Sequence, residues 1–191
     1  MVVVTPQVLI VGLGNIPFPA TRHSVGHYIL DSLALRLGTH FSSVRSLQGL
    51  FAQKTVMIGE NSVDLTLFKP KALMNISGRS VASALRNTAR SPASMIVIHD
   101  SLDHKILTLS PKFGGSANGH NGVKSVITSL GGNKDFHRLR IGIGRDEYDS
   151  AAYVLGKMSL PELKHWRPNG AGAEMVWESL QETIQSILSK R

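Results

Sequence analysis

The sequence contains no cysteine. This absence excludes disulfide bonds, zinc sites built from thiolates and cysteine nucleophiles. The chain also lacks any run of about 18 apolar residues, the length that a membrane-spanning helix needs. Its apolar start, MVVVTPQVLIVGLGN, has no Lys or Arg ahead of the run and no A-x-A-like cleavage site. We therefore expect neither a secretory signal nor a transit peptide.

Several nucleotide-binding and hydrolase motifs are missing as well. The pair Gly12 and Gly14 begins like a dinucleotide fingerprint, but Pro17 stands where the third glycine belongs. The acidic residue of that motif has no counterpart except Asp31, inside a predicted helix, so a nicotinamide or flavin site is excluded. There is no G-x-x-x-x-G-K-[ST] and no G-x-S-x-G. A P-loop and the common α/β-hydrolase nucleophile are therefore excluded too.

Acidic residues are scarce relative to basic ones. The chain has 21 Lys and Arg against 13 Asp and Glu, a net charge of +8. The excess lies in residues 1–145, which hold 16 basic and 6 acidic side chains, whereas residues 146–191 hold 5 and 7. A basic body indicates a polyanionic partner, nucleic acid before membrane. A net charge of this size is explained equally well if it serves only to keep the protein soluble.

The pattern of apolar residues predicts an α/β fold. Continuous or alternating apolar runs predict strands, and four-residue spacing predicts helices. The strands are expected at 8–13, 51–57, 63–69, 95–98, 106–109 and 139–143, and the helices at 24–37, 77–89, 123–130 and 174–188. This order favours one domain over residues 1–191, a sandwich with a mixed, mainly parallel sheet flanked by helices. Residues 145–170 are the least regular, and we expect a connection there without regular structure.

Polar residues follow several of these strands. In α/β folds, ligands bind beyond the carboxyl ends of the strands. Asn15 follows the first strand, Asn75 the 63–69 strand, and His99 and Asp100 the 95–98 strand. A loop rich in Gly and Asn, ending at residues 119–122, could close over them. Their convergence predicts a site, although each residue alone is a common turn or capping residue.

His23 stands where the first helix should begin. A neutral imidazole there, oriented by a carboxylate, could take a proton from water. Asp100, at a strand end, is well placed to be that carboxylate. A histidine in this position is also a common capping residue, and Asp100 could simply form a turn.

The run HDSLDH (99–104) supports a second hypothesis. Its two His and two Asp could contribute to a divalent-metal site. His99 and Asp100 would point to opposite faces of an extended strand, and no helical H-x-x-x-H pair is present. We therefore favour a His–Asp hydrogen bond over a metal.

Amide and basic side chains cluster near the same places. Side-chain amides can hold a peptide backbone and donate to a developing oxyanion. The cations around the Gly-rich loop form either a phosphate-binding rim or an ordinary solvated face. They are Lys105, Lys112, Lys124, Arg138 and Arg140.

Six blocks of sequence resemble one known family. They are VLIVGLGN (8–15), TRHSVG (21–26), KPKALMNISG (69–78), HDSLD (99–103), GGSANGHNG (114–122) and FHRLRIGIGR (136–145). In this order they are similar to bacterial-type peptidyl-tRNA hydrolase, and they include every candidate catalytic and peptide-binding residue. That family cleaves the ester between a peptide and the 3′-terminal ribose of tRNA, recycling tRNA from aborted translation.

The resemblance implies a carboxylic ester hydrolase that works as a monomer without metal or cofactor. It implies cytoplasmic location, or a mitochondrial one in a eukaryotic source, no membrane and peptidyl-tRNA as the partner. His23 would be the base or water-positioning residue, and Asp100 would orient it. The remaining roles would be peptide and ester binding by Asn15, Met74, Asn75 and Asn121, and tRNA binding by Lys112 and Arg140.

The chain departs from the family pattern in loops expected to lie near the acceptor end of the bound tRNA. Between Asn15 and His23 the chain is shorter than usual and lacks the N-P-G-x-x-Y pattern, with Phe18 as the candidate for its aromatic residue. Ser24 stands where many members have Asn, and residues 145–147 replace a Pro-Gly turn. Two other functions stay open: a non-catalytic RNA-binding relative, and a metal-dependent phosphoesterase using residues 99–104.

Overall fold

The computed structural model describes residues 5–145 and 149–190, which form an α/β fold around one mixed sheet. The strand order is β2-β3-β4-β1-β5-β7-β6. The strands are β1 (Gln7–Gly12), β2 (Ser42–Val44), β3 (Gly49–Ile58), β4 (Asn61–Pro70), β5 (Met95–Ser101), β6 (Leu109–Phe113) and β7 (His137–Gly142). The α-helices are α1 (Val25–Leu37), α2 (Gly78–Asn87), α3 (Asn121–Ser129), α4 (Ser150–Leu155), α5 (Leu160–Trp166) and α6 (Ala171–Leu188).

The four central strands are parallel. β1 pairs with β4 and β5, and β5 pairs with β7. The antiparallel pairs lie toward the edges, where β3 joins β4 and β2, and β6 joins β7. The mixed sheet predicted from the sequence is therefore confirmed, including the hairpin of β3 and β4.

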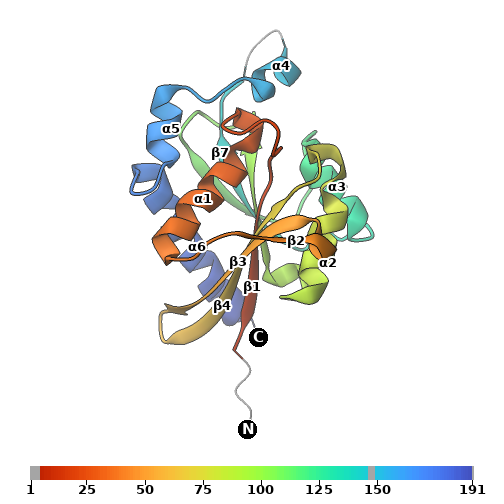
Figure 1. Cartoon of the computed structure of the whole chain (residues 1–191), viewed down its shortest axis with the longest axis vertical. Coiled ribbons are helices and arrows are strands. Elements are labelled where there is room, and N and C mark those ends of the chain that lie inside the picture. Colours follow the sequence, from red (N-terminus) through yellow and green to blue (C-terminus); the bar gives the residue numbers. More distant parts are fainter. Residues whose placement is uncertain (1–4, 146–148, 191) are drawn as a thin grey trace.

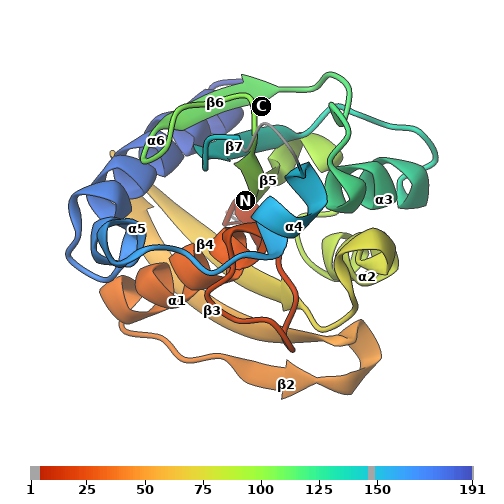
Figure 2. The same cartoon turned by 90° about the horizontal axis from the view of Figure 1, so that it is seen from above.

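Helices cover both faces of the sheet (Figures 1 and 2). The side chains of β1 pack against the helices on both faces of the sheet, because successive side chains of a strand point to opposite faces. Val8 and Ile10 belong to the core cluster that includes residues of α1 and α6. Leu9 and Val11 belong to the cluster that includes residues of α2 and α3. This burial on both faces explains the continuous apolar run of residues 8–13.

Two glycines press the start of α1 against the sheet. A Cβ on Gly12 would lie 2.3 Å from the carbonyl oxygen of Gly26, and one on Gly26 would lie 2.5 Å from that of Ile98. Neither position has room for a side chain. This close approach places His23, three residues before Gly26, at the carboxyl ends of β1 and β5.

Two strand predictions were wrong. β5 does not stop before residues 99–100, because His99 and Asp100 stay in register with Arg140 and Ile141 of β7. No strand spans 106–109: Leu107 has φ of 65°, and its N–H bonds to the carbonyl of Gly142. The strand that follows is β6, whose edge position tolerates Pro111.

The prediction of an irregular connection over 145–170 was also wrong for the described residues, since α4 and α5 lie there. The Asp149 side chain accepts bonds from two N–H groups of α4. Ser159 and Glu162 form a capping box at the start of α5. Residues 146–148, which include two residues of the altered turn noted above, lie outside the described residues. No described helix has the length and apolarity needed to span a bilayer.

The buried His27 predicts a stability that falls in acid. Burial, together with the nearby Lys69 cation, lowers the pKa of this imidazole to about 3. The unfolded chain takes up a proton near the ordinary pKa of 6.5 while the folded chain does not, so acid favours unfolding. Between pH 8 and pH 5 this residue should remove about 2 kcal/mol of the free energy of unfolding.

Urea unfolding of wild type and His27→Leu at both pH values tests this. The variant should lose about 2 kcal/mol less than wild type on acidification. An equal loss in the two proteins would contradict the prediction.

Candidate active site

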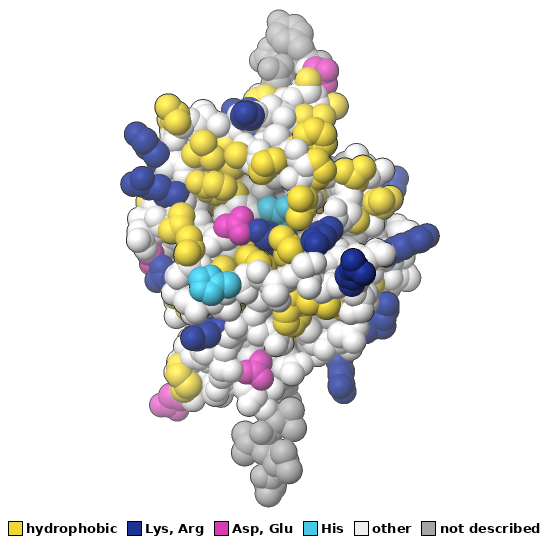
Figure 3. Space-filling model, in the orientation of Figure 1, with side chains coloured by type: hydrophobic (Ala, Val, Ile, Leu, Met, Phe, Trp, Pro, Cys, Tyr) yellow, Lys and Arg dark blue, Asp and Glu magenta, His cyan; other side chains and the backbone are white. Residues whose placement is uncertain are grey.

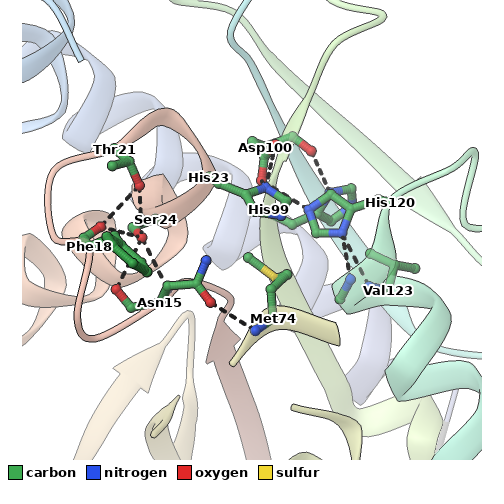
Figure 4. Close-up of polar contacts among 11 residues, drawn as sticks. Asn15, Phe18, Thr21, His23, Ser24, Met74, His99, Asp100, His120 and Val123 are labelled. Carbon is green, nitrogen blue, oxygen red and sulfur yellow. Dashed lines mark hydrogen bonds and ion pairs between the residues drawn. The ribbon is translucent and has the colours of Figure 1, made fainter. Parts of the chain in front are cut away.

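Two histidines converge on one buried carboxylate (Figure 4). His23 Nδ1 lies 2.9 and 3.0 Å from the two carboxylate oxygens of Asp100. His120 Nε2 lies 2.9 Å from Oδ1 of the same group. His23 comes from the short helix η1 (Arg22–Ser24), Asp100 from β5, and His120 from the residue before α3. The predicted partnership of His23 and Asp100 is therefore present in the geometry.

The hydrogen bonds fix the tautomer of each imidazole. A carboxylate only accepts hydrogen bonds, so each ring nitrogen facing Asp100 carries a proton. In His120 the other nitrogen, Nδ1, accepts the N–H groups of Gly122 (3.1 Å) and Val123 (3.2 Å) and so caps α3. In His23 the proton on Nδ1 leaves the lone pair of Nε2 as a proton acceptor.

Asp100 is ionised despite its burial, with a side chain only 3% exposed. Burial alone would raise its pKa, but the contacts with His120 and His23, which donate hydrogen bonds to the carboxylate, outweigh burial. They lower the pKa of Asp100 well below its usual range. The His23 side chain is 13% exposed and lines the adjacent cavity.

His99 contacts both Asp100 and His120. Its Nδ1 donates to the backbone carbonyl of Asp100 at 2.7 Å, and its ring packs edge-on against that of His120. Burial lowers the pKa of His99 well below its usual value. A neutral imidazole therefore packs beside the carboxylate without adding a charge.

The metal group suggested by residues 99–104 does not form. His104 bonds to Ser101, and Asp103 pairs with Arg145. Among the described residues, the group with metal-ligand spacing is instead His23, Asp100 and His120, whose ligand atoms lie within 4.8 Å of one another. In this group each histidine already donates a hydrogen bond from one ring N–H to the carboxylate.

Asn15 is held by its own turn and by the segment after β4. Its Oδ1 accepts the N–H of Met74 at 2.8 Å, so its Nδ2 donor faces the other way (Figure 4). Its N–H donates to Ser24 Oγ at 3.0 Å, and that hydroxyl donates to the carbonyl of Phe18 at 2.9 Å. Ser24 thus ties together the shortened turn between Asn15 and His23.

The other predicted peptide-binding residues lie at helix starts nearby. Asn75 is an exposed residue of the short helix η3 (Met74–Ile76). Asn121, also exposed, is the first residue of α3 and lines the same cavity as His23. Met74 is buried, and a Cβ on Gly122 would lie 2.3 Å from its sulfur, so Met74 packs against the start of α3.

The basic residues divide into two groups. Arg140, on β7, donates to the hydroxyl of Ser110 at 2.7 Å and lines the cavity. Lys112 lies on the neighbouring edge strand β6. Arg138 also lines the cavity, but it is buried and donates to the carbonyls of Gly114 and Ser116, so it holds the Gly-rich loop in place. Figure 3 shows Lys and Arg side chains along both flanks of one face, with apolar side chains between them.

A cavity of about 410 Å³ joins some of these parts, but four predicted site residues are not among those that line it: Asn15, Met74, Asn75 and Lys112. Its lining includes His23 and Asp100, Asn121 of α3, Arg140 of β7, and Val154 and Leu155 of α4. It therefore combines a proton acceptor, amide donors, cations and an apolar wall. Two features of this site were missed from sequence: His120, whose place before a helix is the usual signal of a cap, and the wall supplied by α4.

Comparisons with known proteins point to one family. The family model described as "Peptidyl-tRNA hydrolase" matches residues 9–190. The chain is 42% identical to a peptidyl-tRNA hydrolase of Mycobacterium marinum, over 81% of this chain and 80% of the relative. It is 41% identical to one of Desulfitobacterium hafniense, over 88% and 91%. A crystal structure of peptidyl-tRNA hydrolase from Acinetobacter baumannii has a TM-score of 0.76 and 28% identity, covering 96% of this chain and 95% of that one.

The capping bond of His120 predicts a stability difference between two variants. His120→Ala and His120→Asn both lose the hydrogen bond to Asp100, but asparagine can still cap α3. His120→Asn should therefore be more stable than His120→Ala by about 1 kcal/mol in urea unfolding. Equal stability would contradict the cap and the tautomer assigned from it.

Proposed function

This chain belongs to the peptidyl-tRNA hydrolase family and is a carboxylic ester hydrolase, and on that premise we propose that His23 activates the water that cleaves peptidyl-tRNA. The observation that carries the proposal is the hydrogen bond from His23 Nδ1 to the buried Asp100, which leaves Nε2 as the acceptor. The products are free tRNA and the released peptide.

The reaction needs one water and one base. The water donates a hydrogen bond to His23 Nε2, and its oxygen attacks the carbonyl carbon of the ester while its proton passes to Nε2. The tetrahedral intermediate then breaks the bond to the ribose oxygen, which takes the proton from the imidazolium as it leaves. Asp100 stabilises the imidazolium in between, because its carboxylate is ionised and in contact with the ring. An ester of this kind is activated, so no covalent nucleophile is required.

Amide groups hold the peptidyl part. We assign peptide and ester binding to Asn15, Asn75 and Asn121, with Met74 as part of the wall. The bond from Met74 N–H to Asn15 Oδ1 directs the Nδ2 donor of Asn15 away from Met74, where it can meet a peptide carbonyl or the developing oxyanion. Recognition through backbone amides accepts any peptide sequence. It disfavours free aminoacyl-tRNA, whose α-amine is charged.

The tRNA is bound by charge. We assign Lys112 and Arg140, on the adjacent strands β6 and β7, to the phosphates of the acceptor end. Such contacts release counterions from the nucleic acid, so they bind any tRNA sequence and weaken with salt.

We propose that hydrolysis needs no metal. Both imidazoles donate a ring proton to Asp100, so a metal ion in this cluster would have to displace these protons and break both hydrogen bonds. With those bonds in place, a complete proton-transfer site already exists.

The direct test compares N-acetyl-aminoacyl-tRNA with unblocked aminoacyl-tRNA in the presence of EDTA. Wild type should cleave the blocked substrate much faster. His23→Ala should lower kcat by about 100-fold or more, the usual contribution of a general base. His40→Ala, an exposed histidine substitution outside the cavity, is the matched control and should leave the rate unchanged.

Each other outcome identifies a different function. Loss of hydrolysis on adding EDTA would support a metal-dependent reaction. Binding of tRNA without cleavage of either substrate would support an RNA-binding relative.

The charge assignment has its own test in the salt dependence of KM. Lys112→Ala should raise KM and reduce the slope of log KM against log salt by about 1. Lys54→Ala, an exposed lysine on β3 toward the other edge of the sheet, should leave the slope unchanged. The same slope in Lys112→Ala and wild type would remove Lys112 from the tRNA interface.

A further inference from the structure

We infer that Arg22 is a positioning residue that holds the wall of the cavity against the turn carrying His23. The wall belongs to residues 149–166, which we term the roof segment and which contain α4 and α5. The inference rests on the proposed function, because it concerns substrate binding over His23. Arg22 immediately precedes His23 but is not among the residues that line the cavity.

α4 has little else to hold it. None of its residues is buried, so no core packing fixes its position. Four of its residues, among them Val154 and Leu155, nevertheless line the cavity with His23 and Asp100. Figure 2 shows α4 in front of the central strands, at the end of the molecule where β1 turns into α1. The wall must therefore be fixed by specific polar contacts.

The first contact is an ion pair between Arg22 and α5. Arg22 Nε and one terminal nitrogen lie 3.0 Å from the two carboxylate oxygens of Glu162. The Glu162 side chain is only 2% exposed and that of Arg22 is 16% exposed, so water screens the pair weakly. A planar guanidinium matches both oxygens at once, which an ammonium cannot do.

The second contact joins the same guanidinium to α4. Its Cζ lies 4.4 Å from the centroid of the Tyr153 ring, a cation–π distance. The Tyr153 hydroxyl donates to the carbonyl of Ile143, after β7, at 2.6 Å. One side chain beside His23 therefore contacts both helices of the roof segment.

Backbone bonds continue the attachment along the turn. Arg22 N–H donates to the carbonyl of Gly156 at 3.0 Å, and Met158 N–H donates to that of Ala20 at 2.8 Å. Thr21 and Lys157 form an isolated antiparallel bridge between these bonds. The turn before His23 and the link between α4 and α5 are thus paired like two short strands. Such pairing alone is marginal in water, so the guanidinium is needed to keep it closed.

The expected consequence is on substrate affinity. If only part of the population has the wall in place, the apparent affinity falls by that fraction. The His23–Asp100 bond does not involve the roof segment, so bound substrate should still react. Loosening the roof segment should therefore raise KM more than it lowers kcat.

Two variants test this with N-acetyl-aminoacyl-tRNA and by hydrogen exchange of the backbone amides. Arg22→Lys keeps the charge but loses the two-oxygen contact, and Tyr153→Leu removes the ring without leaving a buried charge unpaired. Each should raise KM about 10-fold and change kcat by less than about 2-fold. Each should also speed exchange at residues 150–158, with α1 and α6 unchanged.

The control is a second arginine with matching contacts. Arg36 pairs with Glu174, its Cζ lies 5.4 Å from the Trp177 ring centroid, and it is not among the residues that line the cavity. Arg36→Lys should leave KM, kcat and the exchange of residues 150–158 unchanged. A double-mutant cycle of Arg22→Lys with Glu162→Gln should give less than the sum of the single effects on KM, because the two side chains act as one contact.

Unchanged KM and unchanged exchange in both variants would overturn the inference. A loss of kcat at constant KM would also overturn it, because Arg22 would then act on His23 and not on the wall. Failure of the proposed function is distinguishable: a His23→Ala enzyme that stays active would refute the base, whereas the exchange of the roof segment would still report on Arg22.

Discussion

The site depends on one buried carboxylate that accepts hydrogen bonds from two imidazoles. Asp100 is 3% exposed, and a charge so far from water is stable only because His23 and His120 donate to it. The same bonds decide the chemistry, because they place the proton of His23 on Nδ1 and leave Nε2 as an acceptor. They also join η1, β5 and the start of α3, so one set of hydrogen bonds fixes the position of the proposed base relative to the sheet and to α3.

The fold supplies this arrangement through backbone packing. The parallel pairing of β1, β5 and β7 brings their carboxyl ends to one edge, and the contact of Gly12 with Gly26 presses the start of α1 onto that edge. His23 and Asp100, 77 residues apart, meet for this reason. The cavity wall has a different origin, since α4 contributes no buried residue and depends on contacts around Arg22. The site thus combines a proposed base, held in place by the sheet, with a wall attached by polar contacts.

Local sequence patterns predicted the elements that are stabilised by local contacts or are fully buried. The run at residues 8–13, the hairpin of β3 and β4, and the four-residue spacing of α1 were all readable, and so was the pairing of His23 with Asp100. The misses share a physical cause. β6 exists because β7 pairs with it, β5 extends because His99 and Asp100 stay in register with β7, and α4 is held by Arg22 and Tyr153. His120 was missed because its role needs both Asp100 and the start of α3, and none of these contacts leaves a periodic signal.

The most direct test of the account is the tautomer of His23. ¹⁵N NMR of the imidazole nitrogens at neutral pH, with signals assigned through His23→Asn and His120→Asn variants, reports which nitrogen of each ring carries the proton. The account predicts a proton on Nδ1 of His23 and on Nε2 of His120, and a loss of the His23 preference in Asp100→Ala. A His23 ring protonated on Nε2, or a preference unchanged without the Asp100 carboxylate, would contradict it.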